Sequence, residues 1–488
     1  MSKSAVKSTS QVEAKVALAD NVDGYTTVNF KDAGNRTRDH YKSNMTKTRF
    51  KLRQYLLPLI RWETARLAWI QEHCRTPFWD EYFALSANLG AHTFFVIMLP
   101  MPFWFGLTHL GRDLVYVLAS GVLFSGMMKD YFCLPRPLSP PLHRISMSGS
   151  AALEYGFIST HSTNAVGAAL TILSYSLEHG TSLSFVAQTV IKTLTWVYML
   201  SIVFGRIYCG MHGFLDVIAG SLLGYILFYI RHVTESYIDE FVRTPGPLVP
   251  LIVAPVILIL VRIHPEPVDP CPCFEDGVAF AGVVLGVDLG LWSTWKLPHT
   301  DKFPYPGASH YVYAESGLVG SILRMVLGIA SIFTWRAIMK PMLHTYLPPV
   351  FRVIEKVGLS MPRGFFLKAS EYSKVPDSIP DSTLVDAGGI KTLLSNMRMR
   401  SDSVGPQSPA DVYESMANYE ERQRRRSLEQ NLYPQIADQL AEEDKVYFEI
   451  PKPRVQYDVE VVTKLIVYTG IGWLGASGCS LLFAKLGL

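Results

Sequence analysis

Long apolar runs separated by short polar stretches dominate the chain from about residue 83 onward. Each run is about twenty residues long, the length that an α-helix needs to cross the hydrocarbon core of a bilayer. Backbone amides in lipid must find their partners within the protein, so helices are the spanning elements that these runs predict. The pattern indicates an all-α, polytopic transmembrane helical bundle of about 8–10 spans. The predicted spans are 83–108, 113–131, 160–178, 185–207, 213–231, 247–263, 277–293, 317–340 and 460–484.

The flanking segments are polar and differ from one another. Residues 1–40 read as disordered, and so does the Ser-, Glu- and Arg-rich stretch 372–458, because neither can bury enough apolar surface to offset chain entropy. Residues 43–75 mix cationic and bulky apolar side chains at helical spacing, which suits a helix on the membrane surface or an ordinary amphipathic packing helix. The predicted divisions are 1–76, a polar tail and interfacial helix; 77–235, a catalytic core; 246–345, additional spans; 346–458, an amphipathic segment and polar loop; and 459–488, a last span.

Two features interrupt the apolar spans. Pro100 and Pro102 predict that the first span is kinked or divided, because proline removes a helix hydrogen bond. Asp288 and Arg324 lie within spans, where ionised side chains usually face the interior of the bundle, and we expect them to pair with each other.

Composition narrows the class of protein. Apolar residues make up 49% of the chain and charged residues 18%, as in a multispanning membrane protein. A formal charge of +3 over 488 residues does not suggest nucleic-acid binding. The six cysteines are scattered, and Cys271-Pro272-Cys273 is too close for an easy disulfide or for usual zinc spacing, so neither is indicated. The N-terminal segment lacks a signal peptide, so insertion is expected to use an internal span.

Three polar clusters lie at the ends of spans, where a site can touch both membrane and water. Any one of their residues has an ordinary explanation, such as a snorkelling lysine or an interfacial arginine. Their joint pattern is Lys-x6-Arg-Pro, then Ser-x-His, then Arg-x5-His-x3-Asp, which favours a single phosphate site. Its members are Lys129 and Arg136 in the first cluster, Ser159, Thr160 and His161 in the second, and Arg206, His212 and Asp216 in the third.

The residue types suit a phosphomonoester. Lys129, Arg136 and Arg206 supply the positive charge that a site without a metal needs to hold an anion. Ser159, Thr160 and the amides at the start of the third span are predicted to add hydrogen-bond donors. No metal and no cofactor are expected.

The two histidines suit a nucleophile and a proton carrier. His212 and Asp216 are four residues apart on one helical face, so the carboxylate can orient the imidazole. His161 has the titration range to act as acid and base. His143 and Arg144 lie between the first two clusters and are candidates for the rim of the entrance.

The three-part pattern resembles the signature of the type-2 phosphatidic acid phosphatase superfamily. The flanking segments are most similar to the sphingosine-1-phosphate phosphatases and their fungal long-chain-base-phosphate relatives. The resemblance covers about residues 77–345. The segments that carry it are Leu134-Pro135-Arg136-Pro137, Glu154-Tyr155-Gly156-Phe157, Arg206-Ile207-Tyr208-Cys209-Gly210-Met211-His212-Gly213 and Cys271-Pro272-Cys273-Phe274-Glu275-Asp276. The resemblance implies a core of the six-helix lipid phosphatase type. It also implies a phosphohistidine intermediate at His212, with His161 protonating the leaving alkoxide.

Three positions depart from the family pattern. Ile158 and Thr160 stand where members usually have proline and often glycine, and Gly205 stands where many have serine. The first two affect the path of the predicted phosphate loop, and the third removes a hydroxyl donor. Every cationic, imidazole and carboxylate position of the pattern is present.

The resemblance implies hydrolysis of sphingoid base 1-phosphates in the endoplasmic reticulum membrane, by a multi-pass protein whose site faces the lumen. Alternatives are a phosphatidate or lipid pyrophosphate phosphatase, a noncatalytic lipid-binding scaffold, or a transporter that uses Asp288 and Arg324. The spans after residue 246 are candidates to wall a lipid channel or to support a homodimer. Two spans before the first cluster place the site on the same side as the basic N-terminal segment, where Asn35-Arg36-Thr37 and Asn44-Met45-Thr46 are glycosylation sequons. The positive-inside rule favours the cytosol for that segment.

Overall fold

The computed structural model describes most of the chain between residues 33 and 488. The described ranges are 33–90, 92–139, 141–145, 153–179, 184–244, 246–294, 311–359, 363–375 and 456–488. The predictions of disorder for 1–40 and 372–458 therefore fall mostly outside the described residues.

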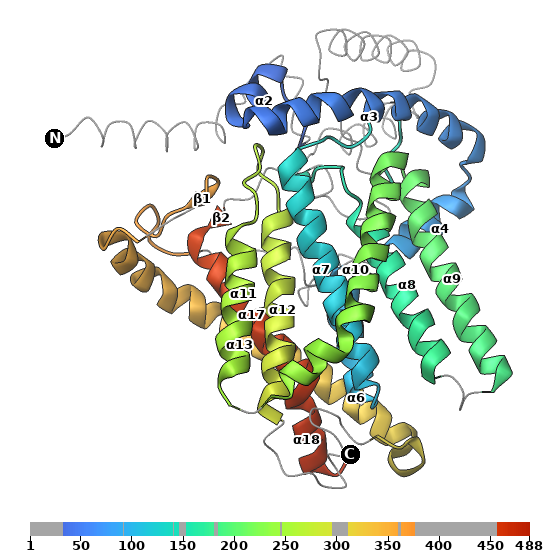
Figure 1. The fold of residues 1–488 in the computed structure, drawn as a ribbon, viewed down its shortest axis with the longest axis vertical. Coiled ribbons are helices and arrows are strands. Elements are labelled where there is room, and N and C mark those ends of the chain that lie inside the picture. Colours follow the sequence, from blue (N-terminus) through green and yellow to red (C-terminus); the bar gives the residue numbers. More distant parts are fainter. Residues whose placement is uncertain are drawn as a thin grey trace, which may run out of the picture.

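Helices build nearly all of the described structure, as predicted (Figure 1). One short parallel pairing joins β1 (Phe366–Leu367) to β2 (Gln456–Tyr457). The helices are α2 (Arg38–Asn44), α3 (Lys47–Cys74), α4 (Pro77–Asn88), α5 (His92–Met98), α6 (Pro100–Trp104), α7 (Thr108–Phe132), α8 (Thr160–His179), α9 (Phe185–Tyr208), α10 (Phe214–Val242), α11 (Leu248–Arg262), α12 (Cys273–Thr294), α13 (Tyr313–Lys356), α17 (Asp458–Trp473), η3 (Leu474–Gly478) and α18 (Cys479–Leu486).

Six of the described helices are long and apolar enough to cross a membrane: α7, α9, α10, α12, α13 and the continuous unit from α17 to α18. Two shorter apolar helical stretches, Phe94–Trp104 and Leu248–Arg262, match predicted spans in position. The predicted first span is divided, since α5 ends at Met98 and α6 begins at Pro100. The chain is therefore a multi-pass membrane protein.

The functional clusters gather at one end of the bundle. Helix α7 runs toward this end, α8 leaves it, α9 returns to it and α10 leaves it again (Figure 1). Helices α4 to α6 together make the crossing that precedes α7. Asp80 of α4 lies at the catalytic end, where Tyr208 at the end of α9 donates to it. Phe103 of α6 lies at the opposite end, beside Gly111 near the start of α7.

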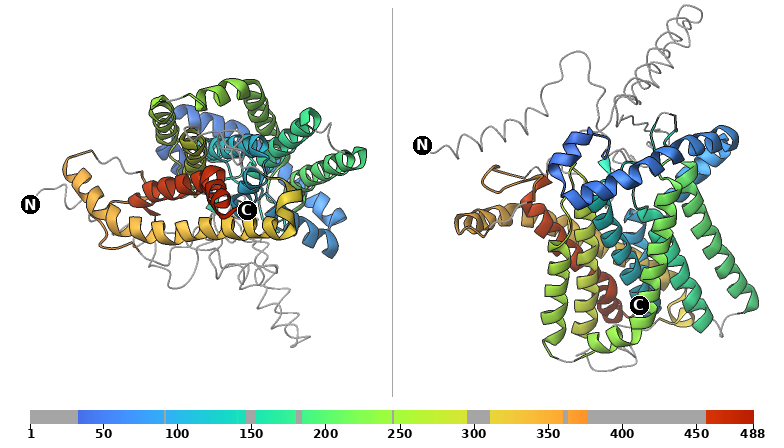
Figure 2. Two further views of the ribbon diagram at one scale, coloured as in Figure 1. Left: turned by 90° about the horizontal axis from the view of Figure 1, so that it is seen from below. Right: turned by 45° about the horizontal axis from the view of Figure 1, so that its top comes forward.

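Helix α3 lies across this same end of the bundle (Figures 1 and 2). It buries Ile60, Glu63 and Leu67 and exposes Trp62 and Trp69. The segment is thus a helix that caps the bundle with one face and presents aromatic residues on the other, as an interfacial helix does. It packs over the loops that carry the candidate site.

Helices α7, α12 and α17 pack closely behind the site. The apolar cavity among α5, α6, α7, α12 and α17 has a volume of only about 30 Å³. A single water occupies about this volume in the liquid. These helices therefore form a packed core behind the site, and the role of the spans after residue 246 as the wall of a lipid channel or as a dimer surface stays a prediction.

The predicted ion pair between Asp288 and Arg324 is wrong. Asp288 instead accepts a hydrogen bond from the Tyr116 hydroxyl. Arg324 donates to the main-chain oxygens of Trp104 and Leu488, both at 2.7 Å. Main-chain oxygens can accept the N–H groups of a guanidinium, and sequence distance gives no signal of such partners.

Candidate active site

Three loops meet where α7, α9 and α12 reach the end of the bundle that α3 covers. Within the loop between α7 and α8, Gly156 N–H donates to Leu134 O at 2.9 Å. This loop is fastened to the one after α9, since Ile145 N–H donates to Cys209 O at 3.0 Å. Gly210 has φ +63° and its α-carbon faces His143 O so closely that a β-carbon would lie 2.8 Å from it. Glycine is therefore required at this turn.

Two of the predicted phosphate-binding cations already hold an anion, which is a carboxylate of the protein. Lys129 Nζ lies 3.1 Å and Arg136 Nη2 3.2 Å from the same oxygen, Glu154 Oε2. Both cations are almost fully buried, at 5% side-chain exposure, whereas Glu154 is 27% exposed. One carboxylate oxygen thus bridges two buried cations, as a phosphate oxygen would.

Arg206 supplies a third buried cation. Its residue exposure is 5%, its Nε has no hydrogen-bond partner among the described residues, and it forms no salt bridge with a described carboxylate. A buried charge without a partner is costly, so this position is one that an external anion would stabilise. We name Lys129, Arg136 and Arg206 together the anion site.

His212 lies directly against the anion site. Arg136 Nη1 is 3.0 Å from His212 Nε2 and also donates to Met211 O at 2.9 Å. A guanidinium can only donate, so Nε2 must be the acceptor and the ring proton must sit on Nδ1. This tautomer leaves a lone pair on Nε2 facing the anion site.

Asp216 lies behind His212 and fixes the start of α10. Its Oδ2 is 3.6 Å from His212 Nδ1, longer than a hydrogen bond, and it accepts the Gly213 N–H at 2.9 Å. Catalytic hydrogen bonds in substrate-free proteins are often long and tighten when substrate binds. His212 and Asp216 therefore lie close together, as predicted, without a hydrogen bond between them in this structure.

Burial lowers the pKa of the His212 imidazole well below its usual value of 6.5. Positive charge from the three cations of the anion site and from His161 lowers this pKa further. The neutral imidazole, which is the nucleophilic form, is thus favoured at neutral pH.

The start of α8 joins the same site. Ser159 N–H donates to Asp216 O at 3.1 Å, and Ser159 Oγ accepts the Ser162 N–H at 3.3 Å, which makes Ser159 the helix cap. Thr160 Oγ1 lies 2.8 Å from Ser125 Oγ of α7, so its hydroxyl contributes to helix packing. His161 is half-buried and lies against Gly90, where a β-carbon would be 2.9 Å from the ring.

Two carboxylates of the site were not among the residues predicted from the sequence. One is Glu154, which stood inside a family-like segment without a role. The other is Glu63 of α3, which accepts the Leu215 N–H at 3.0 Å and leaves Oε2 buried without a described hydrogen-bond partner. Burial raises the pKa of Glu63 above its usual 4.5. Glu63 and Asp216 together cap the first turn of α10, directly after His212.

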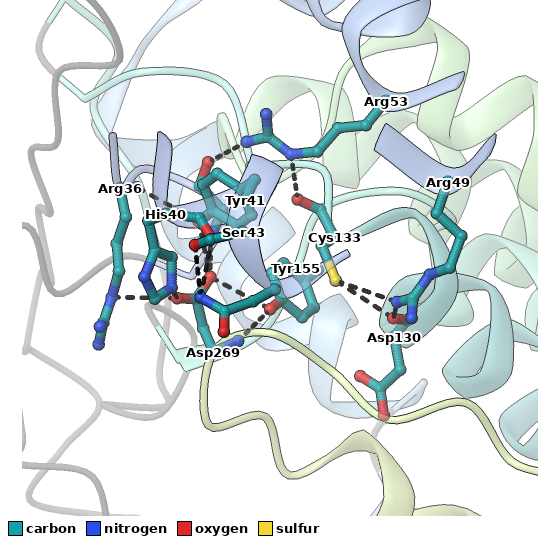
Figure 3. Close-up of polar contacts among 12 residues, drawn as sticks. Arg36, His40, Tyr41, Ser43, Arg49, Arg53, Asp130, Cys133, Tyr155 and Asp269 are labelled. Carbon is teal, nitrogen blue, oxygen red and sulfur yellow. Dashed lines mark hydrogen bonds and ion pairs between the residues drawn. The ribbon is translucent and has the colours of Figure 1, made fainter. Parts of the chain in front are cut away.

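Asp269 ties the N-terminal helices to the loop that carries Glu154 (Figure 3). Its Oδ2 accepts from Tyr41 Oη at 2.6 Å, from Tyr155 Oη at 3.1 Å and from Gly34 N at 3.0 Å. Arg36 lies 3.0 Å from its other oxygen. Tyr155, the residue after Glu154, is held by its hydrogen bonds to Asp269. This contact limits how far the backbone of Glu154 can move.

One departure from the family pattern, Gly205, has a local explanation in the packing of α9 against α4. Gly205 packs against the Phe83 ring of α4, and a β-carbon there would lie 3.0 Å from the ring edge. Arg144, a candidate for the rim, is buried and donates to Pro137 O at 2.6 Å, so it supports the loop. His143 is exposed.

The chain matches the family model of the PAP2 superfamily over residues 110–238. This range contains all of the predicted site residues and omits α3 and α12. No solved structure matches the chain.

Named relatives match a longer part of the chain. A dihydrosphingosine 1-phosphate phosphatase of Schizosaccharomyces pombe is 38% identical over 62% of this chain and 72% of its own length. One of Saccharomyces cerevisiae is 38% identical over 66% of this chain and 78% of its own. The human sphingosine-1-phosphate phosphatase 2 is 28% identical over 48% of this chain and 57% of its own.

Proposed function

Because the chain belongs to the PAP2 superfamily, and within it to the family of the dihydrosphingosine 1-phosphate phosphatases, we propose that it hydrolyses sphingoid base 1-phosphates to the free base and phosphate. It is a lipid phosphatase, since both the family and its named relatives are phosphatases. The mechanism rests on the contact of His212 Nε2 with Arg136, one of three buried cations at the anion site.

Electrostatic attraction between the phosphate and the three buried cations drives the first step of substrate binding. The phosphate enters between Lys129, Arg136 and Arg206 and takes over the cations that Glu154 now bridges. Arg206 gains an anionic partner that it lacks among the described residues, and Arg136 shifts its N–H from His212 Nε2 to a phosphate oxygen. Three cations can then stabilise the charge on the transferring phosphoryl group without a metal or a cofactor.

Transfer to the enzyme follows. His212 Nε2 attacks phosphorus, a P–N bond forms and the P–O bond to the sphingoid carbon chain breaks. His161 gives its proton to the departing alkoxide, which leaves as the alcohol. Asp216 stabilises the positive charge that His212 acquires, because it lies 3.6 Å from Nδ1.

Hydrolysis of the phosphohistidine returns the enzyme to its first state. His161, now neutral, accepts a proton from a water whose oxygen attacks phosphorus. The P–N bond breaks, its electron pair returns to His212 Nε2, and phosphate leaves. In this proposal the first amides of α8 and the Ser159 hydroxyl donate to phosphate oxygens. Thr160 contributes through its amide, because its hydroxyl bonds Ser125.

The surroundings suit a single-chain lipid. Phe204 is 57% exposed and Leu200 42% exposed on α9, within two turns of Arg206. An apolar tail can lie along these side chains in the bilayer while the phosphate reaches the buried cations.

We place the protein in the endoplasmic reticulum membrane with its catalytic end toward the lumen, a proposal supported by the family-like segments of the sequence. The exposed apolar residues Leu251, Leu258 and Ile259 of α11 are offered to lipid or to a second copy in a homodimer. Light scattering of the detergent-solubilised protein separates these two occupants.

Phosphate release from a panel of lipids tests the function. We expect the purified full chain, with chelator present, to release phosphate from dihydrosphingosine 1-phosphate at a much higher kcat/KM than from phosphatidate or a lipid pyrophosphate. The His212→Ala variant should lose at least about 1,000-fold in kcat, the scale lost when a nucleophile is removed. Vanadate should inhibit the wild type, since it mimics the transferring phosphoryl group.

Each arm of this assay can contradict one part of the proposal. Faster hydrolysis of phosphatidate would overturn the substrate class and leave the phosphatase intact. Phosphate release by His212→Ala near the wild-type rate would rule out the nucleophile. Absence of hydrolysis from every lipid would favour a noncatalytic lipid-binding protein.

A further inference from the structure

Three metal-ligating side chains lie together outside the catalytic site, where α7 meets the start of α12. They are Asp130, Cys271 and Cys273, and all three are buried. One carboxylate oxygen and the two sulfur atoms all lie within 4.8 Å of one another. Asp130 follows Lys129 directly in the chain, so this cluster adjoins the anion site without belonging to it.

The carboxylate of this cluster has an unused oxygen. Asp130 Oδ2 is 2.9 Å from His264 Nε2, whereas Oδ1 has no hydrogen-bond partner among the described residues and Asp130 is 0% exposed. Arg49 donates at 2.7 Å to the backbone carbonyl of Asp130, and the Asp130 carboxylate points away from that guanidinium (Figure 3). Arg363 is also near, but its guanidinium donates to His264 O and Pro265 O. A carboxylate oxygen buried without a partner is costly, so a metal ion bound to it would stabilise this position.

Although the Cys271-Pro272-Cys273 spacing is closer than is usual for zinc, the fold brings both sulfur atoms to the Asp130 carboxylate, and we propose that these three residues bind one zinc ion. Two thiolates and a carboxylate are ligands that zinc prefers over magnesium or calcium, and water can fill a fourth tetrahedral position. His264 orients the Asp130 carboxylate from behind, as outer partners of zinc ligands do.

The cluster has the size and charge of such a site. Zinc lies about 2.3 Å from sulfur and about 2.0–2.2 Å from oxygen, so tetrahedral ligand atoms are about 3.4–3.8 Å apart. Small side-chain rotations bring three atoms from within 4.8 Å of one another to this spacing. Zinc replaces the two thiol protons, which pass to solvent, so the net charge beside Lys129 does not change.

The zinc ion would join the end of α7 to the start of α12. Lys129 would thereby be fixed relative to Arg136 by a link that lies outside the catalytic chemistry. The test of the zinc site is independent of the proposed substrate, because it measures bound metal and not the rate of hydrolysis.

Metal content of the full chain tests the proposal. We expect protein produced with added zinc and purified in detergent to contain about one zinc per chain. The double variant Cys271→Ser/Cys273→Ser should lose this zinc. Cys479→Ser, which removes a buried thiol of α18, is the matched control and should keep it.

A second measurement covers the case in which the double variant does not fold. Cobalt exchanged into the wild-type chain should give the intense near-ultraviolet absorption of a thiolate-to-cobalt bond. Wild-type protein that stays well below one zinc per chain after reconstitution, or gives no such band with cobalt, overturns the proposal. So does zinc retained in a folded double variant, or a mass that shows Cys271 and Cys273 joined as a disulfide.

Discussion

Glu154 is the residue on which the charge of the substrate-free site depends. Its carboxylate lies where a phosphate oxygen is expected, 3.1 Å from Lys129 and 3.2 Å from Arg136. The side chain neutralises part of the positive charge that would otherwise be buried without a partner. Substrate must therefore compete with a group of the protein itself.

The variant Glu154→Gln should bind anions more tightly. Removing the competing charge leaves Lys129 and Arg136 free for phosphate, so we expect vanadate to inhibit about tenfold more strongly, which corresponds to about 1.4 kcal/mol. Steady-state inhibition constants measure this change. Glu178→Gln, an exposed substitution at the far end of α8, should leave the constant unchanged. Weaker inhibition in Glu154→Gln would mean that Glu154 holds the two cations in place for phosphate.

The sequence predicted ionic residues that the structure brings close to one another, and their roles in catalysis stay predictions. The spacing of His212 and Asp216 on one helical face places them side by side, as found at 3.6 Å. It could not predict that Thr160 would bond Ser125, because the two lie on different helices and are joined only by packing. Glu154 has no periodic pattern around it that would indicate its role.

The contact between α3 and α10 shows how one element supports another. Glu63 of α3 caps Leu215 of α10 at 3.0 Å, three residues after His212. Gln71, two turns further along α3, donates to His143 O and Tyr208 O, both at 2.8 Å. The covering helix therefore bonds both loops that carry catalytic side chains.

Substitutions at Glu63 should separate its cap from its charge. Glu63→Gln keeps an oxygen for the Leu215 N–H, so we expect a free energy of unfolding near that of the wild type. Glu63→Ala loses the cap and should be less stable by about 1 kcal/mol. Both variants remove a negative charge near His212, which should lower the pKa of the imidazole further and move the acid limb of kcat/KM to lower pH.

Thermal unfolding and pH profiles measure these two effects, with Glu72→Ala on the exposed face of α3 as the control. Equal stability of the Gln and Ala variants would contradict the cap. An unchanged acid limb in both would show that the charge of Glu63 does not reach His212.

The helices themselves were largely predictable, because apolar runs of membrane length leave few alternatives. The division at Pro100 followed from proline chemistry. The contact of α3 with α10 and the partners of Asp288 and Arg324 were not predictable, since they join residues far apart in the chain. No local pattern specifies which of several buried groups will meet.

Helices α2 and α3 lie at the catalytic end of the bundle (Figure 2). The side of the membrane that holds the N-terminal helices is therefore also the side that holds the active site. The basic N-terminal helices and the active site lie at the same end of the bundle, so one measurement locates both. Asn44 is exposed there, whereas Asn35 is 0% exposed. The two sequons are therefore not equivalent.

We expect Asn44 to carry the glycan if the catalytic end faces the lumen. Protein made in cells should then shift in mass on treatment with an endoglycosidase, and Asn44→Gln should abolish the shift. Asn35→Gln, which changes a buried sequon, should retain it. A glycan-free protein whose N-terminal epitope is labelled from the cytosol would reverse the proposed orientation.

The reach of α3 over the catalytic loops also limits how far this enzyme can be shortened. The region that matches the family model, residues 110–238, begins after α3 and ends before Asp269 and α12. A fragment trimmed to those limits would keep His161 and His212 but would expose the first turn of α10 and release the Glu154 loop. The smallest autonomous catalyst is therefore larger than the signature by which its relatives are recognised.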